Sequence, residues 1–371
     1  MESAEYKKQY DEYLARAEKA LSQACERYLP EESDVCRAAR YSLLGGGKRI
    51  RAVLVLAVCD MLHGNAEAAE QFAAAVEMLH CYSLIHDDLP CMDNDDMRRG
   101  KPSCHKAFGE STAMLAGDVL LTEAFEAVAG APAPASVCVH AAQALGAGAG
   151  SRGMVYGQEL DLKYEALAAT EEQLRLIHRN KTGALINAAV QMGAAAAEAD
   201  TETCRVLEAY AYGLGLVFQI VDDVLDVTST PEQLGKPIGS DSENGKTTFA
   251  TLYGVQGAMD LAQKLNAETC AQLHSHFGTK AAFLEQLGKD FQEWGVKPEI
   301  EAFDPGMIAK LLPVLSQLNR PESGETAAFL RALRPFLKPE RQDKVERAAQ
   351  LARFIHLGKT LLLSEGGPRN V

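Results

Sequence analysis

The chain has 371 residues, 47% of them hydrophobic and 24% charged, and carries a formal net charge of −14. Its length is enough for a sizeable core, and its negative charge disfavours binding to nucleic acid or to an anionic membrane surface. Nine scattered cysteines without a C-x-x-C pair argue against a zinc or dithiol site and favour reduced, mostly buried thiols. Alanine-rich runs, few aromatic residues and little β-type alternation predict an all-α fold.

The N-terminal segment, MESAEYKKQYDEYLARAEKA, is charged throughout and lacks the apolar core of a signal peptide. Its aromatic residues recur at helical spacing, which predicts a first helix. The longest apolar run, residues 52–59, is too short to cross a bilayer. We therefore expect no membrane span and a cytoplasmic protein.

A dense cluster of charge occurs in SLIHDDLPCMDNDDMRRGKPS, which holds five aspartates and two arginines. Asp87 and Asp93 would lie about 120° apart on an unbroken helix. Pro90 disfavours helix at Leu89, so we expect the helix that carries Asp87 to end there and Asp93 to fold back. His80 lies two turns before Asp87, on nearly the same face.

A second acidic segment, FQIVDDVLD, places Asp222 and Asp226 four residues apart, so both carboxylates share one face of a helix. Like charges at this spacing repel each other, and burial by apolar neighbours increases the penalty. A cation would remove this repulsion. Oxygen ligands without a histidine or cysteine pattern indicate Mg²⁺, which binds through carboxylates together with substrate phosphates.

Each acidic cluster alone has an ordinary explanation as helix caps or solvated turns. Both clusters, however, lie on apolar helical segments, and basic residues are available near them or elsewhere in the chain. Carboxylate pairs among cations favour a diphosphate held by Mg²⁺ and by Lys or Arg. The basic residues are Lys48, Arg49, Arg51, Arg98, Arg99, Lys181, Lys236 and Lys246.

Five motifs together resemble those of bacterial short-chain polyprenyl diphosphate synthases, most of all farnesyl diphosphate synthases. In chain order they are LLGGGKRIR, HCYSLIHDDLPCMDNDDMRRGKPSCH, NKTGAL, FQIVDDVLD and LGKPIGSDSENGKTTF. The resemblance covers about residues 1–292 and implies an isoprenoid-synthase helical bundle with a central cavity. It further implies a homodimeric, Mg²⁺-dependent prenyltransferase that condenses isopentenyl diphosphate with dimethylallyl or geranyl diphosphate to farnesyl diphosphate.

The resemblance implies metal-binding roles for the aspartates of both motifs. Three of them would ligate three Mg²⁺ ions on the allylic diphosphate: Asp87, Asp93 and Asp222. Three others would support these ligands: Asp88, Asp223 and Asp226. The bound metal would act as a Lewis acid and stabilise pyrophosphate as it leaves.

The resemblance also assigns the basic residues to two substrates. Isopentenyl diphosphate would be bound by Lys48, Arg51, His80 and Arg99. The allylic diphosphate would be bound by Arg98, Lys181 and Lys236. Gln219, Thr182 and the backbone near Lys181 would stabilise the allylic cation. Considered alone, His80, Gln219 and Thr182 would more often be satisfied polar groups of a helical core.

Tyr82 lies five residues before Asp87, about 7.5 Å along a helix, in the direction in which a growing hydrocarbon tail must extend. In the resembling family an aromatic residue here, with two extra residues in the first motif, is typical of enzymes that stop at fifteen carbons. A geranylgeranyl diphosphate synthase is the alternative. A class I terpene cyclase or a non-catalytic partner subunit is disfavoured, because the second aspartate pair and GGGKRIR are both present.

The chain divides by composition into a synthase domain, residues 1–294, and a C-terminal extension, residues 295–371. Basic residues outnumber acidic ones in the extension, although the whole chain is acidic. Its apolar spacing and its prolines predict three short helices. The resemblance does not reach the extension; binding of a protein partner is the preferred interpretation, and a lid over the active site is the alternative.

Overall fold

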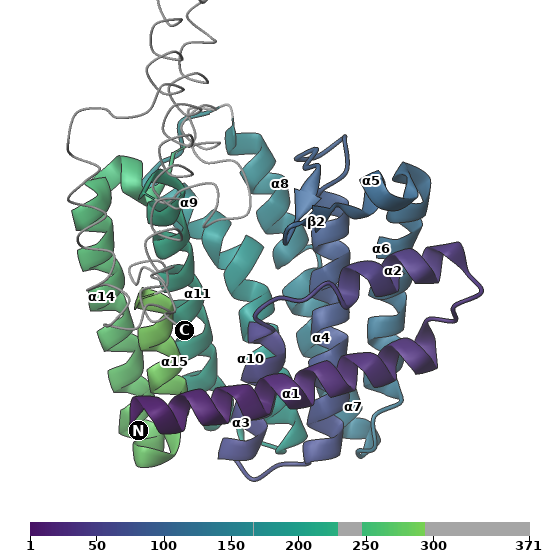
Figure 1. Cartoon of the computed structure of the whole chain (residues 1–371). Helices are drawn as coiled ribbons and strands as arrows, with labels where there is room; N and C mark the ends of the chain where they lie inside the picture. The colour runs from purple at the N-terminus through teal and green to yellow at the C-terminus, as the bar shows by residue number, and fades with distance from the viewer. Residues whose placement is uncertain (166, 229–246, 294–371) are drawn as a thin grey trace, which may run out of the picture. The chain divides into compact units, whose positions relative to one another are not determined.

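The computed structural model describes residues 1–165, 167–228 and 247–293, which form a bundle of long helices (Figure 1). The all-α prediction is confirmed. The helices of the first half are α1 (Ser3–Tyr28), α2 (Asp34–Leu43), α3 (Ile50–Met61), α4 (Ala66–Asp87), α5 (Cys104–Phe108), α6 (Glu110–Ala129) and α7 (Ala135–Ala149). Those of the second half are α8 (Met154–Glu165), α9 (Glu171–His178), α10 (Ala184–Ala196), α11 (Thr201–Thr228), α14 (Phe249–Phe277) and α15 (Ala282–Glu293).

Three short elements interrupt the helices. A two-stranded antiparallel hairpin, β1 (Met97–Arg98) and β2 (Lys101–Pro102), follows the first aspartate motif. A π-helical turn, η1 (Arg179–Gly183), joins α9 to α10, and a 3₁₀ turn, η2 (Gly278–Ala281), joins α14 to α15. Both the hairpin and η1 carry residues that the sequence assigns to substrate binding.

The centre of the bundle consists of α3, α4 and α10, whose buried residues belong to one apolar cluster. The apolar run 52–59, too short for a membrane, lies on α3 and is buried throughout. Small residues allow close contact between these helices: a Cβ at Gly193 of α10 would meet the Val55 carbonyl oxygen at 2.5 Å. The alanine-rich composition therefore supports tight helix packing, which fixes the positions of the α4 and α11 side chains.

Polar side chains cap several helices at their first turns, as propensity predicts. Asn65 accepts from the Ala68 N–H at the start of α4, and Thr170 with Gln173 forms a capping box at α9. Thr248 and Thr251 do the same at α14. These caps define where the helices around the site begin.

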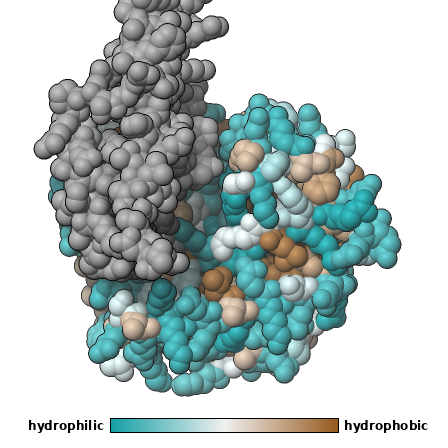
Figure 2. Space-filling model, in the orientation of Figure 1, coloured by the Kyte–Doolittle hydropathy of each residue, from teal (hydrophilic) through white to brown (hydrophobic). Residues whose placement is uncertain are grey.

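The visible face of the molecule is mostly hydrophilic, with small apolar patches (Figure 2). By length and composition α11 could cross a membrane, but half of the relevant segment is buried in the bundle, which is typical of a core helix. All nine cysteines are unpaired and most are buried, as predicted.

Two predictions fall on residues outside the described ranges. Contacts group Met1–Val296 into one compact unit, but the three helices expected in the extension 295–371 lie outside the described residues. Lys236 and Lys246 also lie outside them. The boundary at residue 294, the role of the extension and the placement of both lysines stay predictions.

Candidate active site

The first aspartate motif lies where α4 ends. The helix stops at Asp87, before Pro90, and the Asp93 N–H donates to the Asp87 carbonyl oxygen at 2.9 Å. The chain therefore folds back, as the proline predicts. Asp88 is 2% exposed, and the single Nε–H of Arg98 is shared between its Oδ1 and Oδ2 at 3.0 and 3.1 Å, so this carboxylate is held by the hairpin.

Asp87 lies in a partly buried, charged environment. Burial raises its pKa to about 6; Lys181 and Arg98 oppose the rise, and Asp93 adds to it. These groups act on one carboxylate although they come from α4, the loop after it, β1 and η1. The structure thus brings four predicted site residues together around the end of α4.

The second motif lies near the C-terminal end of α11, at the same end of the bundle as the end of α4 (Figure 1). Its three aspartates have different environments. Asp223 is 7% exposed, and its Oδ2 accepts from the Phe249 N–H at the start of α14 at 2.8 Å. Asp226 is 6% exposed, and its Oδ2 has no hydrogen-bond partner among the described residues. Asp222 is less buried and interacts electrostatically with Lys48.

These carboxylates fit a divalent metal by their chemistry and environment. Asp226 has a buried oxygen without a partner, and Asp87 is destabilised in its charged form by burial; a cation would correct both. Within the described ranges no three acidic, histidine or cysteine side chains form a ready cluster. Mg²⁺ binds through one or two carboxylates together with substrate phosphates and water.

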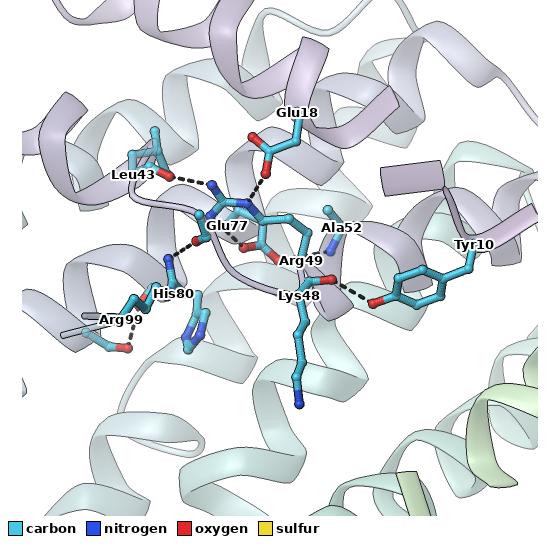
Figure 3. Close-up of polar contacts among 11 residues, drawn as sticks. Tyr10, Glu18, Leu43, Lys48, Arg49, Ala52, Glu77, His80 and Arg99 are labelled. Atoms are coloured by element: carbon cyan, nitrogen blue, oxygen red, sulfur yellow. Dashed lines mark hydrogen bonds and ion pairs between the residues drawn. The ribbon is translucent and has the colours of Figure 1, made fainter. Parts of the chain in front are cut away.

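The basic side chains of the GGGKRIR segment point in two different directions. Arg49 has a left-handed backbone, with φ of 49°, and its side chain enters the core between α1 and α4 (Figure 3). Lys48 points away from this cluster (Figure 3), and the Tyr10 hydroxyl donates to its carbonyl oxygen at 2.8 Å. Burial lowers the pKa of Lys48 to about 8, while the nearby Asp222 charge opposes the shift.

Arg51 and His80 share this basic region. Burial lowers the pKa of Arg51 to about 10, and its Nε has no hydrogen-bond partner among the described residues. Burial, then Arg51 and Arg99, holds the pKa of His80 well below its usual value, so its imidazole is neutral. Arg99 reaches back to the Gly46 carbonyl oxygen. A buried guanidinium with an unpaired donor suits an anionic ligand.

Lys181 and Thr182 lie in the π-helical turn η1. Lys181 Nζ donates to Asp161 Oδ2 at 2.5 Å, and Thr182 Oγ1 donates to Gln219 Oε1 at 2.6 Å. A Cβ at Gly157 would meet the Lys181 backbone nitrogen at 2.0 Å, so α8 can approach only with glycine there. Through their hydrogen bond, Thr182 and Gln219 are neighbours across η1 and α11. π-turns often occur at functional sites.

Tyr82 lies on α4 and is 9% exposed. Its ring is edge-on to His86, with 5.5 Å between the ring centroids. The buried ring therefore lies on α4 on the N-terminal side of Asp87, as the sequence predicts.

Several residues that shape the site were not predicted from the sequence. Asp161 pairs with Lys181, and His178 stacks on Phe249 with its Nε2 3.8 Å from Asp223 Oδ2. Glu77 lies one turn before His80, and that spacing was the signal that could have pointed to it. Asp161 and His178 have no comparable signal in the sequence.

The fold and these side chains define an all-helical enzyme with an acidic group and a basic group suited to diphosphate chemistry. The sequence profile described as polyprenyl synthetase matches residues 32–286, and the chain belongs to that family. It is a prenyltransferase that condenses isopentenyl diphosphate with allylic diphosphates.

Curated relatives include plant enzymes. Geranylgeranyl pyrophosphate synthase, chloroplastic, of Capsicum annuum is 45% identical over 272 residues, which cover 72% of this chain and 73% of that protein. Geranylgeranyl pyrophosphate synthase 3, chloroplastic, of Arabidopsis thaliana is 43% identical over 284 residues, 74% of this chain and 79% of that protein.

Similar solved structures are bacterial. A geranyltransferase from Legionella pneumophila has a TM-score of 0.71 and 40% identity, and covers 79% of this chain and 99% of its own. A geranyltransferase from Helicobacter pylori complexed with magnesium and isoprenyl diphosphate has a TM-score of 0.67 and 35% identity, covering 76% and 98%.

These comparisons correct two expectations. The prediction of a cytoplasmic protein is wrong by this comparison, because the names of the curated relatives place them in the chloroplast. The family is confirmed, but the curated relatives favour the geranylgeranyl alternative over the predicted farnesyl product.

Proposed function

We propose that the chain condenses isopentenyl diphosphate with dimethylallyl and then geranyl diphosphate, and that it stops at farnesyl diphosphate. The observation that carries the product length is the buried Tyr82 ring, five residues before Asp87 on α4. A helix rises about 1.5 Å per residue, so the backbone of Tyr82 lies about 7.5 Å from that of Asp87 along the helix axis, in the direction proposed for the growing chain.

Geranylgeranyl diphosphate is the second candidate product, and the curated relatives at 45% identity favour it. Two features of this chain favour the shorter product: the aromatic ring at Tyr82 and its packing against His86. The bacterial geranyltransferases among the solved structures agree with the shorter product.

Magnesium is the proposed cofactor, with three ions held by Asp87, Asp93 and Asp222. Bound Mg²⁺ supplies Lewis acidity that stabilises the departing pyrophosphate. The structure supports different roles for the remaining aspartates. Asp88 is held by Arg98 and Asp223 by the Phe249 N–H, so both support the ligands by fixing helix ends, whereas Asp226 keeps an open oxygen.

The two diphosphates are proposed to bind to different basic groups. Arg98, Lys181 and Lys236 hold the allylic diphosphate. Isopentenyl diphosphate is held by Lys48, Arg51, His80 and Arg99. The neutral His80 contributes a hydrogen bond rather than a charge.

Thr182 and Gln219 are proposed to face the developing allylic cation. Their hydrogen bond orients the two side-chain dipoles before the reaction begins, which is how preorganised electrostatic stabilisation works. Attack by the isopentenyl double bond followed by proton loss, proposed to go to the departing pyrophosphate, requires no nucleophile from the protein.

The proposed assembly is a homodimer, with residues 295–371 as a binding segment for a protein partner. A terpene cyclase would not need the isopentenyl-binding residues, and a non-catalytic subunit would not need the complete aspartate set. Both rivals predict no transfer of isopentenyl units by the purified chain.

The test is incubation of the purified chain with Mg²⁺, labelled isopentenyl diphosphate and dimethylallyl or geranyl diphosphate, followed by product chromatography. Fifteen-carbon product is expected from wild type, with Tyr82→Ala shifting it toward twenty carbons or more. Ser83→Ala is the control, since it removes little volume beside the same ring. Twenty-carbon product from wild type would favour the second candidate, and an unchanged fifteen-carbon product from Tyr82→Ala would place the floor elsewhere.

A further inference from the structure

A buried carboxylate lies beneath the basic group that is proposed to bind isopentenyl diphosphate. Glu77 on α4 is 3% exposed, and its Oε1 accepts from the Ala52 N–H, in the first turn of α3, at 3.2 Å. Its Oε2 lies 3.8 Å from Arg49 Nη1. Glu77 therefore links α4 to the beginning of the helix that carries Arg51 (Figure 3).

Arg49 extends this link to two further elements. Its Nε donates to Glu18 Oε1 of α1 at 2.8 Å, and its Nη2 donates to the Leu43 carbonyl oxygen, at the end of α2, at 2.7 Å. The side chain is 1% exposed. One guanidinium thus joins α1, α2 and α4 at the point where the chain enters α3, and the residue itself is out of reach of a substrate.

Glu77 also balances the charge of the substrate-facing arginines. Its negative charge acts on both Arg51 and Arg99, and these arginines otherwise lie near each other and near Arg49. Like charges in a poorly solvated region repel strongly, and a buried counter-charge holds them in place. Without the Glu77 charge, the Arg51 side chain would be more stable in a position closer to water, because its Nε has no hydrogen-bond partner among the described residues.

We propose that Glu77, acting through Arg49 and the first turn of α3, is a positioning residue that holds Lys48 and Arg51 ready for isopentenyl diphosphate. This inference rests on the proposed roles of those two residues. It assigns Glu77 to one substrate only, because within the described part of the chain its carboxylate pairs with Arg49 and with the Ala52 N–H of α3, beside the basic group.

The test compares two identical substitutions on one helix. Glu77→Gln removes the buried charge with almost no change in shape. Glu70→Gln is the matched control: Glu70 lies two turns earlier on α4 and accepts from Arg16 of α1 at 3.0 Å, so it is also an interhelical ion pair. Steady-state kinetics are measured with each diphosphate varied in turn, and thermal unfolding is recorded for every variant.

We expect Glu77→Gln to raise the KM for isopentenyl diphosphate about tenfold, which corresponds to about 1.4 kcal/mol. The KM for geranyl diphosphate and kcat should stay within about twofold. Glu70→Gln should leave both KM values unchanged whatever it does to the melting temperature. A purely structural role would reduce the active fraction and kcat without changing one KM selectively, and that result would overturn the proposal.

A lower KM for isopentenyl diphosphate in Glu77→Gln would also overturn the proposal. The Glu77 carboxylate would then weaken binding by repelling the diphosphate, and it would not position the basic residues. If that variant does not fold, Arg49→Lys gives the same test, since an ammonium cannot bridge the same three partners at once. Lys48→Ala separates the two levels of inference. If it leaves the KM for isopentenyl diphosphate unchanged, the proposed site fails and this inference with it; if it raises that KM while Glu77→Gln does not, only this inference fails.

Discussion

Asp222 and Asp223 are adjacent in the sequence, yet their replacement should have different consequences for stability. Asp223 is buried, and its Oδ2 accepts the Phe249 N–H at 2.8 Å, which joins α11 to the start of α14. Asp222 is less buried and lies one helical turn from Asp226. Asp223→Ala therefore removes a contact between helices, whereas Asp222→Ala removes a repulsion from Asp226 together with an attraction to Lys48.

The magnitudes follow from these environments. A hydrogen bond to a charged acceptor contributes about 1.5–3 kcal/mol, and leaving a buried N–H without a partner has a similar penalty. We expect Asp223→Ala to lower the free energy of unfolding by about 2–3 kcal/mol. Asp222→Ala should change it by no more than a few tenths of a kcal/mol, because the relieved i,i+4 repulsion from Asp226 and the lost attraction to Lys48 have opposite signs.

The assay is urea unfolding at neutral pH in EDTA, combined with Mg²⁺-dependent turnover. Asp222→Ala should abolish turnover while keeping the unfolding midpoint, and Asp223→Ala should lower the midpoint clearly. Asp223→Asn is the control, since its amide oxygen can still accept from Phe249 and should recover most of the stability. Equal midpoints for the two alanine variants would refute the assignment of different roles.

Two further predictions concern pH. Because burial raises the pKa of Asp87 to about 6 from 3.8, its ionised form destabilises the metal-free fold above pH 6. Asp87→Asn should therefore be more stable than wild type in EDTA by up to about 3 kcal/mol at pH 8, with the difference disappearing toward pH 4; a pH-independent difference in urea unfolding would contradict this. His80→Gln should leave the pH dependence of the KM for isopentenyl diphosphate near neutral pH the same as in wild type, because burial and the nearby arginines hold the pKa of His80 well below its usual value. An inflection present in wild type and lost in the variant would show that His80 titrates there.

The elements of the fold were largely predictable from local signals. Helical spacing and alanine content predict the bundle, and Pro90 predicts both the end of α4 and the return of Asp93 to Asp87. The motifs of the candidate site were also predictable, because they are contiguous in the sequence. The partners of these motifs were not, since Asp161 and His178 reach the site from other helices through tertiary packing, and Glu77, although on α4 itself, pairs with Arg49 and α3 across a helix contact.

The hardest property to predict was which of two adjacent charged residues is held by protein partners and which is left for a ligand. Neighbouring positions on a helix differ by about 100° in direction, so when one side chain faces a cavity the next faces a neighbouring helix. Asp222 and Asp223 differ in this way on α11, and Asp88 is held by the hairpin while Asp87 is not. At the start of α3 the left-handed backbone of Arg49 has the same effect, since it sends this side chain into the core between Lys48 and Arg51. In each case one charge is fixed by protein partners, and the adjacent charge is the one proposed to face a ligand. A doubled charge such as DD or KR in this chain therefore combines an anchoring group with a proposed ligand-facing group, and only the neighbouring element decides which is which.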